Sequence, residues 1–181
     1  MRAFAGESQA RSRYTIAAEH AANEGMFTIA DVFRYTADQE RAHAERFYDL
    51  LKELSGETVH IDGSYPIDCQ DTLSELLRNE HEEYADVYQN FGDTAEEEGF
   101  WEAASAFYQI AEIEHVHEKR FGALADMLES NMYYSTEQVS EWICTNCGYI
   151  HEGRLAPKVC PVCRHEQGYF LPYSMACYKL P

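Results

Sequence analysis

Positively charged residues are scarce in this sequence of 181 residues. Only 14 Lys and Arg residues stand against 32 Asp and Glu, so the formal net charge at pH 7 is −18. Nucleic acids and anionic membrane surfaces are bound through clusters of basic side chains, so the composition argues against both as main partners. Acidic side chains that converge inside a fold require cations, which makes the acidity itself a reason to look for metal sites.

Long apolar runs are also absent. The opening residues, "MRAFAGESQARSRY", are polar from the start, unlike the apolar stretch of a signal peptide. No run approaches the roughly 18 apolar residues of a membrane helix. Four of the six cysteines form two Cys-x-x-Cys pairs, which in an intracellular protein is typical of metal binding. We therefore expect a cytoplasmic protein without a membrane segment, in which Cys69 and Cys177 are packing or incidental residues.

Two segments, residues 1–54 and 73–129, have the apolar periodicity of long amphipathic helices. Each is broken once by a Glu-Gly pair, so each predicts two helices. Residues 55–72 are rich in Gly, Pro, Ser and Asp and predict a crossover between the second and third helices. The expected architecture is an all-α four-helix bundle over residues 1–134, followed by a small metal-bound β/loop domain over residues 135–181.

The two helical segments resemble each other at a constant offset of 74 in the numbering. An internal duplication of helix pairs implies approximate two-fold symmetry and a site on the pseudo-axis to which both halves contribute. The identical pairs are Glu24/Glu98, Gly25/Gly99, Ala30/Ala104, Phe33/Phe107, Ala37/Ala111, Glu40/Glu114, His43/His117, Arg46/Arg120, Phe47/Phe121 and Tyr14/Tyr88.

The pattern Glu-x-x-His is weak evidence alone, because four of the eight histidines have a glutamate three residues earlier. Glu40–His43 and Glu114–His117 nevertheless correspond in the repeat, and both interrupt an apolar helix face. Ionised groups in a core are costly unless they are paired or bound to metal. These two pairs are therefore predicted metal ligands, whereas Glu112–His115 has no counterpart and is predicted to be a charged flank.

The first and third helices also carry acids on their apolar faces. These are Glu7 in the first helix and Glu80 and Glu83 in the third. A bundle with glutamates on two helices and Glu-x-x-His on the other two follows the plan of carboxylate-bridged, ferritin-like two-metal proteins, and such ligands suit iron or manganese. Tyr14 and Tyr88 lie one to two turns away, where they either donate hydrogen bonds to ligating carboxylates or are ordinary buried tyrosines.

The segment "CTNCGYIHEGRLAPKVCPVC" has the spacing C-x2-C-x12-C-x2-C. Four thiolates with this spacing are a strong signal for one tetrahedral site that holds either zinc or a single iron, and the motif alone favours structural zinc. The predicted ligands are Cys144, Cys147, Cys160 and Cys163.

Taken in order, "AFAGESQARSRY", "ADQERAHAERF", "NEHEEYADVY", "IAEIEHVHEKRF" and "WICTNCGYIHEGRLAPKVCPVCRHEQGYF" resemble the rubrerythrin family across nearly the whole chain. The resemblance implies a ferritin-like di-iron bundle with a C-terminal rubredoxin-like domain, and iron rather than zinc at the four cysteines. It implies that the catalytic di-iron ligands are Glu7, Glu40, Glu80, Glu83, Glu114 and His117, with His43 exchanging with Glu83.

The activity implied by the resemblance is reduction of hydrogen peroxide to water as a defence against oxidative stress. Electrons would come from an external reductase fed by NAD(P)H and pass through the iron at the four cysteines. A head-to-tail homodimer is a further implication of the resemblance. Two alternatives stay open from the residues alone: a ferroxidase or iron-storage bundle that uses the same glutamates, and a non-catalytic zinc-ribbon interaction protein.

Overall fold

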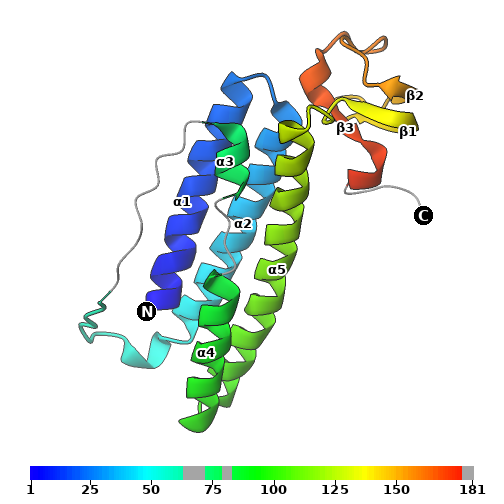
Figure 1. Ribbon diagram of the computed structural model, residues 1–181. Helices are drawn as coiled ribbons and strands as arrows, with labels where there is room; N and C mark the ends of the chain where they lie inside the picture. The colour runs from blue at the N-terminus through cyan, green and yellow to red at the C-terminus, as the bar shows by residue number, and fades with distance from the viewer. Residues whose placement is uncertain (63–71, 79–82, 177–181) are drawn as a thin grey trace.

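A computed structural model describes residues 1–62, 72–78 and 83–176, and for residues 78 and 83–86 it describes the backbone alone. Within these ranges, five α-helices form an elongated bundle, and a small three-stranded sheet lies against one end of it (Figure 1). None of the helices in the described ranges combines the length and the apolar character that crossing a membrane requires.

The predicted helical bundle is confirmed. Its helices are α1 (Arg2–Asn23), α2 (Phe27–Asp49), α3 (Leu73–Arg78), α4 (Glu83–Glu97) and α5 (Trp101–Glu129). A short 3-10 turn over Lys52–Leu54 follows α2. The sequence predicted one third helix from residue 73 to the Glu-Gly break. The structure describes two helices in that segment, α3 and α4, and residues 79–82 lie outside the description.

The Glu-Gly breaks form the same turn in both halves of the bundle. Gly25 and Gly99 adopt the left-handed conformation, with φ of +75° and +83°. The amide of Gly25 donates to the carbonyl of Ala22, and the next amide donates to Ala21, which is the Schellman pattern of a helix end. Glycine tolerates this conformation without a Cβ penalty, so each pair stops one helix and starts the next.

The interior of the bundle has two apolar layers separated by a polar one. The layer nearer the sheet is built around Tyr14, Ile29, Phe33, Leu77, Phe121 and Leu124. The layer at the other end is built around Ala3, Phe47, Tyr88, Ile110 and Ala111. Along α1, α2 and α5, the predicted ligands occur between residues of the first layer and residues of the second.

The sheet is antiparallel, with the strand order β2-β1-β3. Its strands are β1 (Ser135–Cys144), β2 (Ile150–Leu155) and β3 (Phe170–Pro172). Trp142, Cys144, Cys160 and Phe170 are fully buried and form its small core. Helix α5 ends at Glu129, and the domain boundary between residues 134 and 135 stays a prediction.

The C-terminal module packs against the turn between α1 and α2. Tyr169 stacks on Phe27 with ring centroids 4.4 Å apart. A methyl group added at Gly168 would overlap the carbonyl oxygen of Gly25, so only glycine permits this close approach. Leu171 is buried with the residues of the bundle core. The module is thus docked at the end of the bundle where α2 begins (Figure 1).

Candidate metal centres

A cluster of acidic and imidazole groups occupies the polar layer of the bundle. Glu7 from α1, Glu40 and His43 from α2, and Glu114 from α5 each offer one ligand atom, and these atoms lie within 4.8 Å of one another. Glu7, Glu40 and His43 are buried, and the Glu114 side chain is 12% exposed. Charged groups gathered in such a place need compensating cations or protons.

His117 of α5 completes the described part of this cluster. Its Nδ1 atom lies 2.8 Å from Glu40 Oε1 and 3.2 Å from Glu114 Oε2. On the other side, His43 Nδ1 lies 3.0 Å from Glu40 Oε2 and 3.1 Å from Glu114 Oε1. The two rings are nearly parallel, with centroids 5.8 Å apart. Glu40 and Glu114 therefore both lie between the two imidazoles, where a bridging carboxylate of a two-metal site would lie.

The donor set fits metal ions. Glu40 Oε1 and Glu114 Oε1 are buried, and neither has a hydrogen bond of acceptable geometry in the described part of the chain. A buried carboxylate oxygen without a hydrogen bond is costly, and a bound cation would satisfy it. Carboxylates with a minority of imidazoles are the ligands that iron and manganese take.

The pKa values of the cluster residues are shifted by burial and by their neighbours in the cluster. Burial lowers the pKa of His43, but the carboxylates of Glu114, Glu40 and Glu7 next to its Nδ1 atom outweigh burial and raise the pKa to about 12. The same competition, with Glu114 and Glu40 as partners, raises the pKa of His117 to about 9. Burial raises the pKa of the Glu7 carboxyl above its usual range. Both imidazoles are therefore cationic at neutral pH unless metal ions replace their protons.

The two predicted tyrosines have different surroundings in the described structure. The hydroxyl of Tyr88 donates to Glu7 Oε1 at 2.6 Å and so fixes the orientation of that carboxylate. The hydroxyl of Tyr14 is buried, and the described residues give it no hydrogen bond. Its pseudo-symmetric acceptor would come from the segment around Glu80, which lies outside the description. A hydrogen bond from Tyr14 to a ligand stays a prediction.

The remaining predictions on these helices have mixed outcomes. Glu80 lies outside the described residues, as does the side chain of Glu83, whose backbone begins α4. Glu112 and His115 are exposed. His115 Nδ1 faces Glu118 at 3.4 Å on the surface, away from the cluster.

Sequence reasoning missed a series of hydrogen-bonded polar side chains that contacts the cluster from outside. His117 Nε2 lies 3.1 Å from Gln39 Oε1, and Arg120 Nη1 lies 3.1 Å from the same oxygen. Arg120 Nη1 also donates to Thr36 Oγ1 at 3.1 Å. Gln39 and Thr36 could have been noticed because they break the internal repeat: both corresponding positions in the second half are isoleucine.

The four predicted cysteines of the C-terminal module form a second cluster. Cys144 Sγ lies 3.7 Å from Cys163 Sγ, and Cys147 Sγ lies 3.6 Å from Cys160 Sγ. Sulfur atoms bound to one metal at about 2.3 Å in a tetrahedron would be about 3.8 Å apart, so these distances fit a single ion. The module therefore has a rubredoxin-like four-cysteine site.

The loops that carry these cysteines are two similar knuckles. Gly148 follows the first Cys-x-x-Cys pair with φ of +78°, and Arg164 follows the second with φ of +65°. The amide of His165 lowers the pKa of the Cys163 thiol, whereas burial raises the pKa of Cys144. Backbone N–H groups directed at sulfur favour the thiolate that a metal needs.

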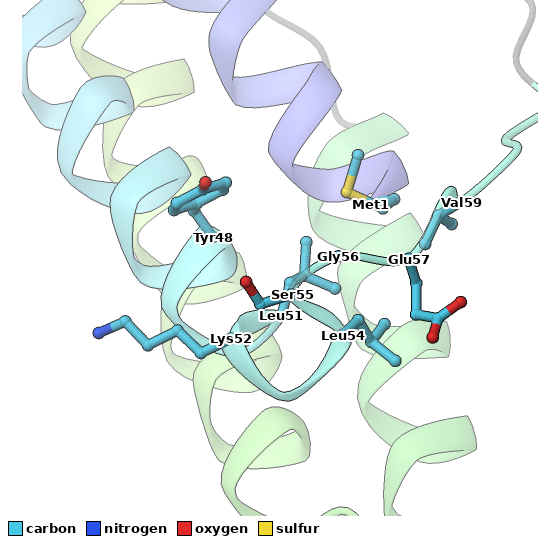
Figure 2. A pocket seen from close by; sticks show the side chains of 9 residues that line it. All are labelled: Met1, Tyr48, Leu51, Lys52, Leu54, Ser55, Gly56, Glu57 and Val59. Carbon is cyan, nitrogen blue, oxygen red and sulfur yellow. The ribbon is translucent and has the colours of Figure 1, made fainter.

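The bundle also has a cavity of about 330 Å³ next to the end of α2, shown in Figure 2. Its lining includes none of the described residues of the two metal clusters, so it is not part of either candidate centre. The lining residues are Met1, Tyr48, Leu51, Lys52, Leu54, Ser55, Gly56, Glu57 and Val59.

Comparison with known proteins agrees with this pair of sites. The family model of rubrerythrin matches residues 1–125, and that of the rubrerythrin rubredoxin-like domain matches residues 142–171. The chain belongs to the rubrerythrin family. The resemblance inferred from the motifs is thus confirmed, and the family places the chain among oxidoreductases with a di-iron site and a four-cysteine site.

Several rubrerythrins are similar over nearly their whole length. The chain is 49% identical over 175 residues to rubrerythrin-1 of Clostridium acetobutylicum, covering 94% of this chain and 90% of that protein. It is 43% identical over 172 residues to the rubrerythrin of Nitratidesulfovibrio vulgaris, covering 93% and 88%. A solved structure of nigerythrin in a mixed-valence state superposes with a TM-score of 0.59 at 26% identity, covering 95% and 83%.

Proposed function

We propose that this protein is a cytoplasmic peroxidase that reduces hydrogen peroxide to water at a di-iron centre and protects against oxidative stress. Electrons would reach that centre through iron bound at the four-cysteine site. The observation that carries the proposal is the presence of two unlike metal sites in one chain: a buried carboxylate–histidine cluster and a thiolate cluster with an exposed cysteine. A ferroxidase would use the same carboxylates but would leave the four-cysteine site without a role.

The proposed di-iron centre uses carboxylates from all the long helices of the bundle. Its identity as an iron site is supported by a relative of similar fold, because one solved structure is of nigerythrin in its fully reduced, all-ferrous state. The proposed ligands are Glu7, Glu40, Glu80, Glu83, Glu114 and His117, with His43 as the ligand that exchanges with Glu83.

Reduction of one hydrogen peroxide molecule to two waters takes up two electrons and two protons. Two bound ferrous ions would supply the electron pair and the Lewis acidity that holds a peroxide. The side chains supply a dry, ordered surrounding: Glu7 and Glu40 are buried, and the hydroxyl of Tyr88, whose oxygen lies 2.6 Å from Glu7 Oε1, donates its proton to that carboxylate and orients it. His117 is held by contacts to both of its ring nitrogens.

The position of the module supports a homodimer in which the four-cysteine iron of one subunit serves the other subunit. The module contacts the bundle at Phe27, at the start of α2, whereas Glu40 lies further along the same helix. At the rise of an α-helix, Phe27 and Glu40 lie about 20 Å apart along the helix axis, so the module contacts the bundle well away from the cluster of the same subunit. Cys147 is exposed, so a separate NAD(P)H-fed reductase could reach the four-cysteine site from solvent.

The proposal is tested by peroxide turnover of anaerobically purified protein with an artificial electron donor. We expect Glu114→Ala to lower the rate at least about a hundredfold, because it removes a carboxylate that faces both imidazoles. Glu112→Ala is the matched control: this exposed glutamate lies two residues away on the same helix, and its loss should leave the rate within about twofold. Equal losses, or no turnover by the unsubstituted protein, would contradict the proposal.

A further inference from the structure

The tautomer of His117 can be read from its neighbours. An arginine side chain only donates hydrogen bonds, so the Gln39 atom that lies 3.1 Å from Arg120 Nη1 must be the amide oxygen. The same oxygen lies 3.1 Å from His117 Nε2, and it can only accept. His117 Nε2 must therefore carry the proton. In the neutral ring this leaves the lone pair on Nδ1, the atom that faces Glu40 and Glu114.

The other half of the repeat is built differently at the corresponding positions. Gln39 corresponds to Ile113, which is 37% exposed, and Thr36 corresponds to Ile110. Arg46, the counterpart of Arg120, instead pairs with Glu102 on the surface at 2.9 Å. None of the described residues forms a hydrogen bond with the Nε2 atom of His43. Two histidines that are equivalent in the repeat are thus supported differently.

We propose that Gln39 is a positioning residue that fixes the His117 ring as a permanent Nδ1 ligand of one metal of the pair. Gln39 is held by Arg120, which also donates to Thr36. The inference rests on the proposed di-iron function and deepens it. The apolar residue at position 113 withholds the same support from His43, which leaves that ring free to enter and leave the other metal's coordination sphere.

The physical basis is the usual effect of an outer hydrogen bond on a metal-bound imidazole. An acceptor on the far nitrogen selects the tautomer, orients the ring and increases the basicity of the ligating nitrogen, and its loss typically costs about 10- to 100-fold in metal affinity. Arg120 further restrains the Gln39 side chain, because it donates a hydrogen bond to the amide oxygen. The Arg120 guanidinium is itself placed 5.3 Å from the centre of the Tyr35 ring. Gln39 itself is only partly buried, so its exchange need not disturb the core.

The test exchanges residues between the two halves of the repeat. Gln39→Ile places behind His117 the residue that the repeat has at position 113, and Ile113→Gln makes the reverse exchange. Gln39→Glu keeps an acceptor oxygen at the same place and serves as the conservative rescue. Each full-length variant, with iron retained at the four-cysteine site, is titrated anaerobically with ferrous iron against a chelator, and the affinity of each of the two bundle ions is measured.

We expect Gln39→Ile to weaken one of the two bundle ions by about 10- to 100-fold and to leave the other unchanged. Gln39→Glu and Ile113→Gln should bind both ions no more than about threefold more weakly than the unsubstituted protein. Two ions of unchanged affinity in Gln39→Ile would overturn the positioning role while leaving the proposed function intact. An unsubstituted bundle that takes up no ferrous iron would overturn both.

Discussion

The turns of the two helix pairs adopt the same backbone conformation at Gly25 and Gly99, yet they have different surroundings. The first turn is covered by the C-terminal module, where Phe27 stacks on Tyr169. The second turn is open to solvent, and Trp101, the counterpart of Phe27 in the repeat, is 66% exposed. The halves share the features that build a helix pair and differ in what each pair contacts.

The same contrast recurs at the metal cluster. Both halves supply a Glu-x-x-His pair, but within the described ranges only His117 has a glutamine behind it, and only His43 has a third carboxylate, Glu7, within 3.6 Å. A duplicated helix pair thus explains why two metal ions can be bound almost symmetrically. The departures from the repeat explain how the two positions can behave differently in one reaction.

The largest effect on iron binding and turnover is expected from removal of a carboxylate that contacts the histidines of both halves. Glu40 has one oxygen 3.0 Å from His43 and the other 2.8 Å from His117, so Glu40→Ala should remove a ligand from both metal ions. We expect loss of both bundle irons and at least about a thousandfold loss of peroxide turnover, with the iron at the four cysteines retained. Iron analysis together with the visible spectrum of the four-cysteine site measures this.

The matched control for this change is Glu45→Ala, because Glu45 is an exposed residue of α2 that pairs with Arg41 at 3.5 Å. It should keep all its iron and about the same turnover. If Glu40→Ala lost only one bundle ion, the placement of Glu40 between the two metal positions would be wrong.

A smaller effect is expected on the pH dependence of iron binding. Since the pKa values of His43 and His117 are raised to about 12 and about 9, both rings carry protons at neutral pH, and each ring that binds iron must release one. Raising the pH removes this cost, so ferrous affinity should increase by about tenfold per pH unit for each ligating histidine. In His117→Ala, the number of protons released on iron binding, read from the slope of log affinity against pH, should fall by about one. An affinity that fell as the pH rose through neutrality would contradict the protonation described here.

The smallest effect concerns the docked module. Phe27→Ala removes the ring that stacks on Tyr169 and should lower the free energy of unfolding by about 1 kcal/mol. Trp101→Ala, at the equivalent but exposed position, should change it by less than about 0.5 kcal/mol. Urea unfolding followed by the absorbance of the four-cysteine site compares the two. Equal changes would mean that this contact does not stabilise the docked module.

Much of the fold could be predicted because its signals are local or repeated. The Glu-Gly turns, the apolar faces and the two Cys-x-x-Cys pairs each follow from short stretches of sequence. The cluster was predictable because Glu114 and His117 interrupt an apolar face and have counterparts in the first half of the repeat. Their placement between two apolar layers follows from the same pattern.

Other features depend on contacts that no local pattern encodes. The docking of the module requires Gly168 to lie against the carbonyl of Gly25, which is far away in the sequence. The support of His117 by Gln39 could not follow from the identical positions of the repeat, because Gln39 lies at a position where the two halves differ. The available signal for this support was a polar residue in the first half that aligns with an isoleucine in the second half.

The central claim is that peroxide is reduced at the bundle cluster with electrons that pass through the iron at the four cysteines. It is tested most directly by mixing anaerobic, fully reduced protein, with its iron counted beforehand, with hydrogen peroxide while the visible absorbance is recorded. The account predicts about three irons per chain and rapid return of the oxidised four-cysteine absorbance, which Glu114→Ala should slow at least about a hundredfold. Zinc in place of iron, or oxidation of the four-cysteine site that is equally fast in Glu114→Ala, would contradict it.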